Sequence, residues 1–192
     1  PLSSMNNNEI ADKIALQLLS DEPAAMLLGL ELLTQQEQWP DYWMYYLRKL
    51  YERAWDILYY ETEDDHGIDW TAFYKLFSYN KDDSLHIGCF EVLPTVRECT
   101  GNYTELSDNY FFSFYLGKCT MRLYIFGNHY EQTKVEDDHP TLHDFQYRLG
   151  DDPWEQAYVV LDGTLYYENS SIHKLMINRL KIELKKKIHD NP

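Results

Sequence analysis

The chain has 192 residues, of which 44% are hydrophobic and 16% aromatic, so it can bury a sizeable core and does not resemble a disordered protein. Its 17 basic and 32 acidic residues give a net charge of −15. Such a surface repels nucleic acids and anionic membranes and attracts basic proteins. We therefore expect a basic protein partner, no direct nucleic-acid contact and no membrane contact, although the same charge also serves solubility.

The three cysteines, Cys89, Cys99 and Cys119, form no CxxC pair, and no signal peptide precedes the first helical pattern. Both features predict buried, reduced thiols and a cytoplasmic location. No apolar stretch approaches the ~20 residues that a membrane span needs. Residues 1–4 precede Met5 and are expected to be a cloning remnant, which leaves 5–192 as a single domain.

Apolar residues at helical spacing begin the chain and predict a short helical hairpin. The first helix covers about 8–20. Ser20 or Asp21 is expected to cap the second helix, which has Pro23 in its first turn and ends near residue 36.

A longer helix follows at about 41–60, and we expect Trp39-Pro40 to break the chain before it. Its apolar face is surrounded by tyrosines. A short helix after Asp69 completes a helical part that spans 5–79.

The apolar period then changes from 3.6 to 2, which indicates strands. One strand is expected around residues 85–90 and ends before Pro94. The segments 110–116 and 119–125 alternate on either side of Gly117-Lys118, which predicts a β-hairpin with a type II′ turn. Both faces of this hairpin carry apolar or aromatic residues, so we expect both to be covered.

Pro140 and Gly150 bracket an expected helix at about 140–149. Asp162-Gly163 predicts a second hairpin between 158–161 and 164–167. Ser170 or Ser171 is expected to cap a last helix, whose apolar residues lie four apart. The expected fold is therefore α+β: N-terminal helices (about 8–79) packed with a mainly antiparallel sheet of about five strands (about 84–168) and a C-terminal helix, so that 84–192 forms the second part of the domain.

Charge is unevenly distributed along the chain. Basic minus acidic residues give 4 − 14 = −10 for 1–70, 7 − 16 = −9 for 71–170 and 6 − 2 = +4 for 171–192. Cations in the last turns of a helix complement its dipole. The alternatives for this basic helix are a small contact site or docking on the acidic body.

An acidic cluster follows the tyrosine-rich helix and is our candidate partner-binding site, with aromatic anchors beside carboxylates. Its spacing does not match a calcium-binding EF-hand, and a merely solvated loop is the alternative. The candidate residues are Tyr59, Tyr60, Glu61, Glu63, Asp64, Asp65 and Asp69.

A second cluster offers ligands that a divalent metal such as zinc accepts. His139 and His143 are four residues apart at the expected helix start, with Asp137 and Asp144 as possible further ligands. Acidic residues also stabilise the start of a helix without any metal. No nucleotide-binding loop, GxSxG or HExxH motif is present, so we assign no catalytic residue and no cofactor other than this possible metal.

The stretches 10–19 and 28–33 resemble a leucine-rich helical hairpin found in bacterial leucine-rich-repeat and related proteins. The small, acidic, aromatic-rich composition is similar to that of bacterial toxin-neutralising immunity proteins. This similarity implies a non-catalytic intracellular binding protein that engages a basic partner, most sharply an immunity or inhibitor protein against a toxin.

Two other hypotheses remain open. One is a metal-dependent enzyme centred on His139 and His143. The other is an anti-defence or DNA-mimic protein, for which the sequence lacks the ordered rows of acids that imitate phosphates. The sequence leaves the oligomeric state open.

Overall fold

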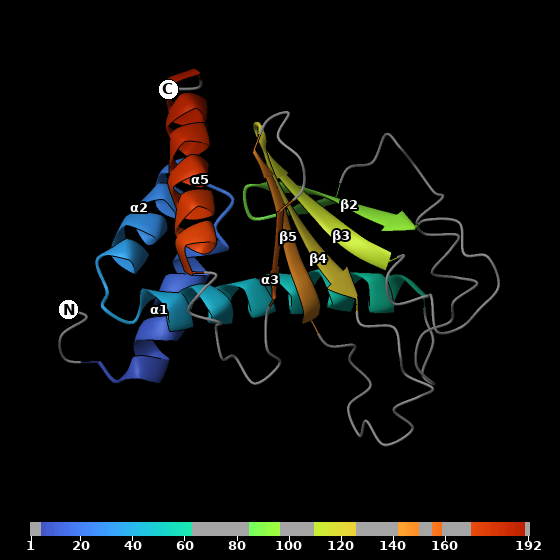
Figure 1. Ribbon diagram of the computed structural model, residues 1–192, viewed down its shortest axis with the longest axis horizontal. Helices are drawn as coiled ribbons and strands as arrows, with labels where there is room; N and C mark the ends of the chain where they lie inside the picture. Colours follow the sequence, from blue (N-terminus) through green and yellow to red (C-terminus); the bar gives the residue numbers. More distant parts are fainter. Residues whose placement is uncertain are drawn as a thin grey trace.

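The structure is a computed structural model that describes residues 5–62, 85–96, 110–125, 142–149, 155–158 and 170–190. Within these residues three N-terminal helices precede a six-stranded sheet, and a long helix follows it. Neighbouring strands are antiparallel and follow sequence order, β1-β2-β3-β4-β5-β6. Figure 1 shows α1, α2 and α5 gathered at one end, with α3 running from that end alongside the sheet. The α+β fold expected from the sequence is confirmed.

The first two helices form the predicted hairpin, α1 (Asn7–Leu18) and α2 (Pro23–Thr34). Asn6 caps α1, because its side-chain oxygen accepts from the Glu9 N–H at 2.9 Å, while its amide nitrogen donates to the Glu9 carboxylate at 3.2 Å. These paired bonds satisfy groups that the helix start would otherwise leave without an intrahelical partner.

Two details of the helix starts differ from expectation. Glu22, and neither Ser20 nor Asp21, is the N-cap residue of α2, and its side chain makes no cap bond. The Ser20 hydroxyl instead accepts from the backbone N–H of Glu22 at 3.2 Å, just before the helix begins. The third helix, α3, covers Trp39–Thr62, so Trp39-Pro40 starts the helix instead of breaking the chain before it. Proline fits a first helical turn because its missing N–H would have no partner there.

The apolar face predicted for α3 is confirmed at Trp43, Leu47, Leu50 and Ala54, and the burial extends further around the helix than the pattern indicated. Tyr46 and Tyr51, expected at the margin of this face, are 0% and 2% exposed. Tyr51 meets Phe112 of the sheet edge to face, with ring centroids 6.1 Å apart. The described side chains that α3 buries are Tyr42, Trp43, Met44, Tyr46, Leu47, Leu50, Tyr51 and Ala54.

The single strand expected around residues 85–90 is two strands, β1 (Leu85–Ile87) and β2 (Phe90–Val96). They pair across a turn at Gly88, whose φ of +59° suits glycine and few other residues. Pro94 lies inside β2 and pairs with Phe112 of β3, so it does not end the strand. The alternation missed the turn because apolar residues continue through it.

The central hairpin is confirmed, with β3 (Tyr110–Leu116) and β4 (Cys119–Ile125) joined at Gly117, whose φ is +57°. A Cβ at Gly117 would also collide with the Glu183 carboxylate of the last helix. The positive φ is the reason that this turn requires glycine, whereas the Glu183 side chain can turn away from a Cβ.

The helix expected at 140–149 is wrong, because residues Leu142–Leu149 form β5, which pairs with β4 and with β6 (Glu155–Tyr158). Phe145, Tyr147 and Leu149 alternate with polar neighbours, which is a strand period, but the flanking Pro140 and Gly150 dominated the prediction. The hairpin predicted at 158–167 lies outside the described residues beyond Tyr158, as does the helix predicted after Asp69.

One face of the sheet forms the core with the helices. Cross-strand register places Phe114 beside Val92 and Met121, and all three are 0% exposed. On the opposite face Ser113 and Thr120 are also buried, in line with the expectation that both faces of the central hairpin are covered. The buried residues of the core face are Ile87, Phe90, Val92, Phe112, Phe114, Leu116, Cys119, Met121, Leu123 and Tyr147.

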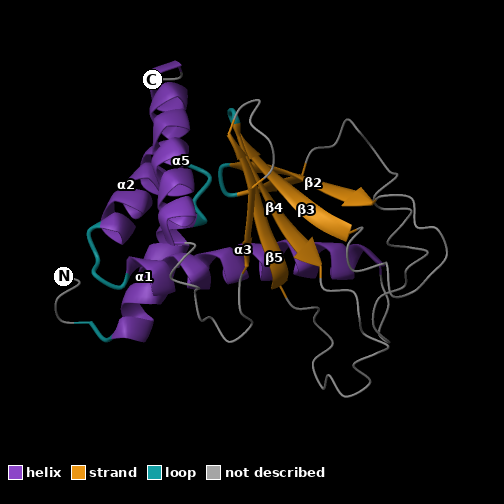
Figure 2. Cartoon of the chain, viewed as in Figure 1, coloured by secondary structure: helices purple, strands orange, loops and turns teal. Residues whose placement is uncertain are grey.

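The last helix, α5 (Ser170–Asp190), packs against α2 and the sheet (Figure 2). Met176, Leu180 and Leu184 are fully buried, as their spacing predicted. His173 is also buried, and its Nδ1 accepts from the Trp43 Nε1–H at 2.8 Å. The neutral ring thus carries its proton on Nε2, and burial lowers the pKa of His173 from 6.5 to about 4.

The burial of His173 predicts that the stability of the protein depends on pH. Between pH 6.5 and pH 4 the unfolded chain protonates this histidine and the folded chain does not, because the pKa of His173 is lowered to about 4. The free energy of unfolding should therefore fall by up to about 3 kcal/mol as pH decreases through this window. Urea unfolding across the window measures it.

The control is His173→Asn, which keeps an oxygen acceptor near the position of Nδ1 but does not titrate. The carboxylates contribute equally to both proteins, so the difference between their pH profiles isolates the histidine. Parallel profiles for the wild type and the variant would contradict the assignment.

Candidate partner-binding surface

The structure places the start of the predicted acidic cluster at the C-terminal end of α3. Tyr59, Tyr60 and Glu61 belong to its last turns. Glu63, Asp64, Asp65 and Asp69 lie outside the described residues. The cluster therefore begins at the end of α3 that lies away from α1 and α2 (Figure 1), about 36 Å along a helix of 24 residues.

The charge at this end of α3 opposes the helix dipole. Its last turn contains Glu61 and no basic residue, whereas its first turn contains Asp41. Backbone carbonyls make a helix C-terminus partially negative, so a carboxylate there costs about 0.3–1 kcal/mol when exposed. Asp41 is placed favourably by the same rule. The acidic end of α3 is thus not explained by the stability of the helix itself.

The predicted metal-ligating residues do not have the helical geometry expected for them. His143 and Asp144 are consecutive residues of β5, and consecutive residues of a strand belong to opposite faces of the sheet. Asp137 and His139 lie outside the described residues. Within the part of the chain that the structure describes, no three His, Cys, Asp or Glu residues are grouped closely enough to hold a metal ion.

A pocket of about 390 Å³ lies where the α1–α2 connection, the β1–β2 turn and the end of α5 meet. The turn reaches the connection closely, because a Cβ built on Gly88 would lie 3.2 Å from the carbonyl oxygens of both Leu19 and Ser20. Sequence reasoning missed this pocket, because its residues come from four separate segments. They are Asp21, Pro23, His86, Gly88, Cys89, Glu91, Tyr115 and Lys187.

Cys89 is the one thiol among the lining residues, and its surroundings oppose a role as a nucleophile. Its thiol donates to the Ser20 carbonyl oxygen at 3.4 Å. Burial raises the pKa of Cys89 from 9.0 to about 11, and the attraction of Lys187 offsets only part of this effect. The thiol is thus protonated at neutral pH, whereas nucleophilic catalysis by a cysteine uses the thiolate.

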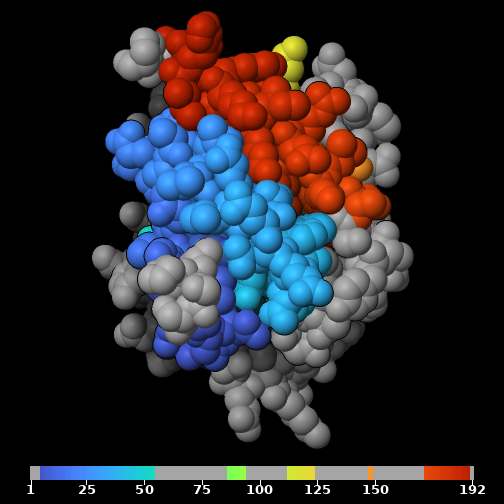
Figure 3. Space-filling view, turned by 90° about the vertical axis from the view of Figure 1, so that its left-hand side faces the viewer, coloured from blue at the N-terminus to red at the C-terminus, as the bar shows by residue number. Residues whose placement is uncertain are grey.

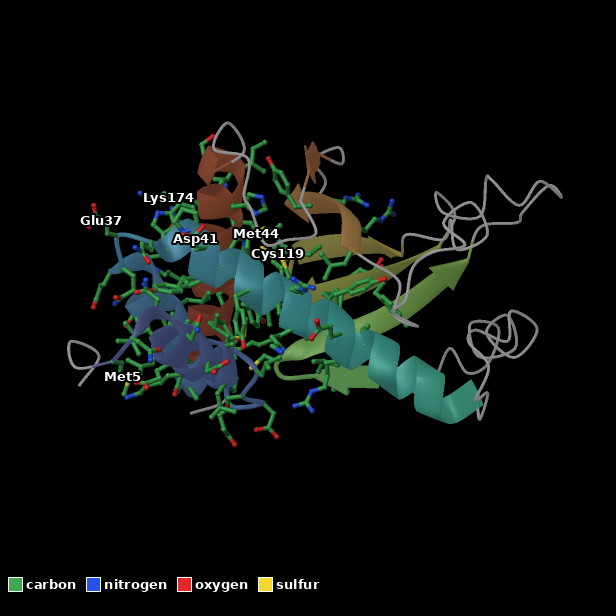
Figure 4. All side chains as sticks on the ribbon, turned by 90° about the horizontal axis from the view of Figure 1, so that it is seen from below. Met5, Glu37, Asp41, Met44, Cys119 and Lys174 are labelled. Atoms are coloured by element: carbon green, nitrogen blue, oxygen red, sulfur yellow. The ribbon has the colours of Figure 1, made fainter. Side chains whose placement is uncertain are left out.

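Cys119 is the second described free cysteine. It is 2% exposed, and burial raises its pKa to about 12. Figure 4 labels Cys119 in the interior of the molecule. Cys99 lies outside the described residues. The expected burial of the thiol is confirmed for Cys119, while Cys89 is half-buried.

The basic helix α5 docks on the acidic N-terminal hairpin, which was one of the alternatives that the sequence left open. Lys181 donates to the Thr34 hydroxyl at 2.8 Å, and burial lowers the pKa of Lys181 while Glu31 opposes that shift. Lys186 and Glu183 form an ion pair within α5 at 3.4 Å. Lys185, Lys186 and Lys187 remain exposed.

No protein-family model, curated protein or solved structure matches this chain. Among the helices of the described residues, none combines the length and apolar character needed to cross a membrane.

The raised thiol pKa values predict slow labelling. At pH 8 only about one in a thousand Cys89 thiols and one in ten thousand Cys119 thiols are ionised, from pKa values of about 11 and about 12. In a Cys99→Ser background, an aromatic disulfide reagent should modify both slowly, about tenfold faster per pH unit, and rapidly after unfolding. Fast labelling that levels off near neutral pH would indicate an activated thiol instead.

Proposed function

We propose that this protein is a non-catalytic binding protein that engages a basic protein partner through the acidic end of α3. The observation that carries the proposal is the placement of negative charge at the negative pole of that helix. Glu61 occupies the last turn, and Glu63, Asp64 and Asp65 follow within four residues of sequence. A basic partner would relieve the repulsion among these carboxylates and the helix dipole, and that relief would become binding energy.

The net charge supports the same class of partner. At −15, the chain attracts basic proteins over distances comparable with the Debye length, about 8 Å at physiological salt. Electrostatic steering of this kind raises association rates and makes binding sensitive to salt. Tyr59 and Tyr60 immediately precede the acidic residues in sequence, and aromatic anchors beside charged groups typically dominate interface energies.

The most specific version of the proposal is that this protein is an immunity or inhibitor protein that neutralises a toxin. Toxins that cut nucleic acids carry basic surfaces for their substrate, and an acidic inhibitor binds such a surface in place of phosphates. The protonated state of the Cys89 thiol in the described pocket is compatible with a non-catalytic role. In this proposal the protein acts in the cytoplasm, where such a toxin meets its nucleic-acid substrate.

The first test is capture of the partner. The tagged protein is incubated with lysate of its source cells at low salt, and the retained protein is identified by mass spectrometry and purified. We expect a basic protein whose affinity falls steadily as salt rises, and whose production without this chain arrests growth. A partner that is acidic, or is held with salt-independent affinity, would contradict the proposal.

The second test separates binding from stability. Glu61→Gln should raise the free energy of unfolding by about 0.5 kcal/mol, because it removes charge from the negative end of α3. Combined with Glu63→Gln, Asp64→Asn and Asp65→Asn, it should weaken partner binding at least about tenfold. Unfolding in urea and titration calorimetry measure the two effects.

The matched control neutralises four carboxylates that lie outside α2, α5 and the end of α3: Glu9→Gln, Asp12→Asn, Asp41→Asn and Glu91→Gln. Both variants change the net charge equally, so only a local site makes them differ. Equal losses of affinity would show that the partner senses the overall charge, and the acidic end of α3 would then lose its assigned role.

A further inference from the structure

The exposed apolar side chains of the described residues gather on the helices at one end of the molecule. Leu28 of α2 is 50% exposed, and Leu175 and Ile182 of α5 are each 42% exposed. Leu175 and Ile182 are seven residues apart and therefore share one face of α5. The fourth large apolar residue that is exposed among the described residues is Leu16, which lies on α1.

The two helices lie side by side on one surface of the molecule (Figure 3), and Lys181 of α5 bonds to Thr34 of α2. We call the surface that carries Leu28, Leu175 and Ile182 the α2–α5 face. Lys187 lines the same pocket as Asp21 and Pro23, so the end of α5 lies beside the start of α2. The two helices are therefore antiparallel.

The two halves of this face carry opposite charges of the same size. Residues 20–38, which include α2, contain Asp21, Glu22, Glu31 and Glu37 and no Lys or Arg, which gives 0 − 4 = −4. Residues 170–190, which form α5, give 6 − 2 = +4. A face with one acidic and one basic half, each with an exposed apolar side chain, is complementary to its own rotated copy.

We propose that the α2–α5 face binds a second copy of this chain about a twofold axis that runs parallel to the two helices and between them. This rotation lays α5 of each copy over α2 of the other. It preserves position along the helices, so the cationic end of α5 meets the acidic start of α2 in the other copy. Leu28 of each copy then faces the apolar stripe of α5 in its partner.

The size of the face sets the strength of this dimer. With 21 residues, α5 is about 31 Å long, and two neighbouring helices are about 20 Å wide, so each copy contributes roughly 600 Å². A stable interface of standard size buries about 800 Å² per partner. The dimer is therefore weak and reversible. The net charge of −15 makes two chains repel each other, but physiological salt screens this repulsion beyond about 8 Å. The opposite charges in contact at the α2–α5 face are screened much less.

The test is sedimentation equilibrium of the full chain over a range of concentrations up to about 1 mM, with paired substitutions. Leu28→Lys faces the basic helix of the other copy and should weaken dimerisation at least about tenfold, whereas Leu28→Glu should weaken it less. Ile182→Glu, facing the acidic helix, should also weaken it about tenfold. In the double variant Leu28→Lys with Ile182→Glu, the new charges attract across the interface, and the affinity should recover to within about threefold of the wild type.

Leu16→Lys, the matched control on α1, should leave the dimer unchanged. Far-ultraviolet circular dichroism checks that each variant folds, which the exposure of these positions favours. A monomer at all concentrations would overturn the proposal. So would a dimer insensitive to the Leu28 and Ile182 substitutions, a dimer lost equally with Leu16→Lys, or a double variant no better than its parents.

Discussion

The buried hydrogen bond between Trp43 and His173 joins two helices that are 130 residues apart in sequence. Trp43 lies near the start of α3 and His173 near the start of α5, and both side chains are 0% exposed. An indole N–H and an imidazole nitrogen buried without partners would each cost about 1–3 kcal/mol, so this bond selects one relative placement of the two helices. The rest of α5 then buries Met176, Leu180 and Leu184 against the core.

The sheet depends on that placement because its strands alone do not enclose a core. Each of the six described strands pairs with its neighbour in sequence, so the order of strands in the sheet follows the order of the chain. Turns at Gly88 and Gly117 join two of the pairs. The apolar face of the sheet is covered by α3, through Tyr51 on Phe112, and by α5. Glu183 of α5 lies against Gly117, at the turn of the central hairpin.

The parts of the fold that could be predicted are those in which one sequence pattern, either strand alternation or helical spacing, is clear and no other pattern conflicts with it. The β3–β4 hairpin combines strict alternation with a glycine turn, and α1, α2 and most of α3 have helical spacing with few competing signals. The prediction was wrong at β5, where bracketing Pro140 and Gly150 suggested a helix against the alternation of Phe145, Tyr147 and Leu149. It also merged β1 and β2, because Ile87 and Phe90 flank a turn that includes the apolar Cys89.

The candidate sites were less accessible to sequence reasoning than the fold. Acidic residues near Glu61 are visible as a run, but their conflict with the dipole of α3 depends on where the helix ends. The pocket around Cys89 collects residues from separate segments, and no spacing rule connects Asp21 with Lys187. No sequence pattern connects His173 with its donor, Trp43, because the two residues are 130 positions apart. Contacts between distant segments are fixed by packing, which a single sequence does not reveal.

The charges of the described helices suggest why the two ends of α3 can serve different purposes. At its start, the acids of α2 and its flanking residues meet the cations of α5, so the local charges nearly cancel and the surface is left with exposed leucine and isoleucine. At its end, about 36 Å away, the last turn of α3 brings no base to oppose Glu61. Screening over about 8 Å at physiological salt isolates these environments from each other. A neutralised apolar face favours association with a like surface, whereas the acidic end of α3 is, in our proposal, the site for a partner of opposite charge. If both proposals hold, a dimer built at the first end carries two acidic ends, and a target with two basic sites at the matching distance would be held far more tightly than one with a single site.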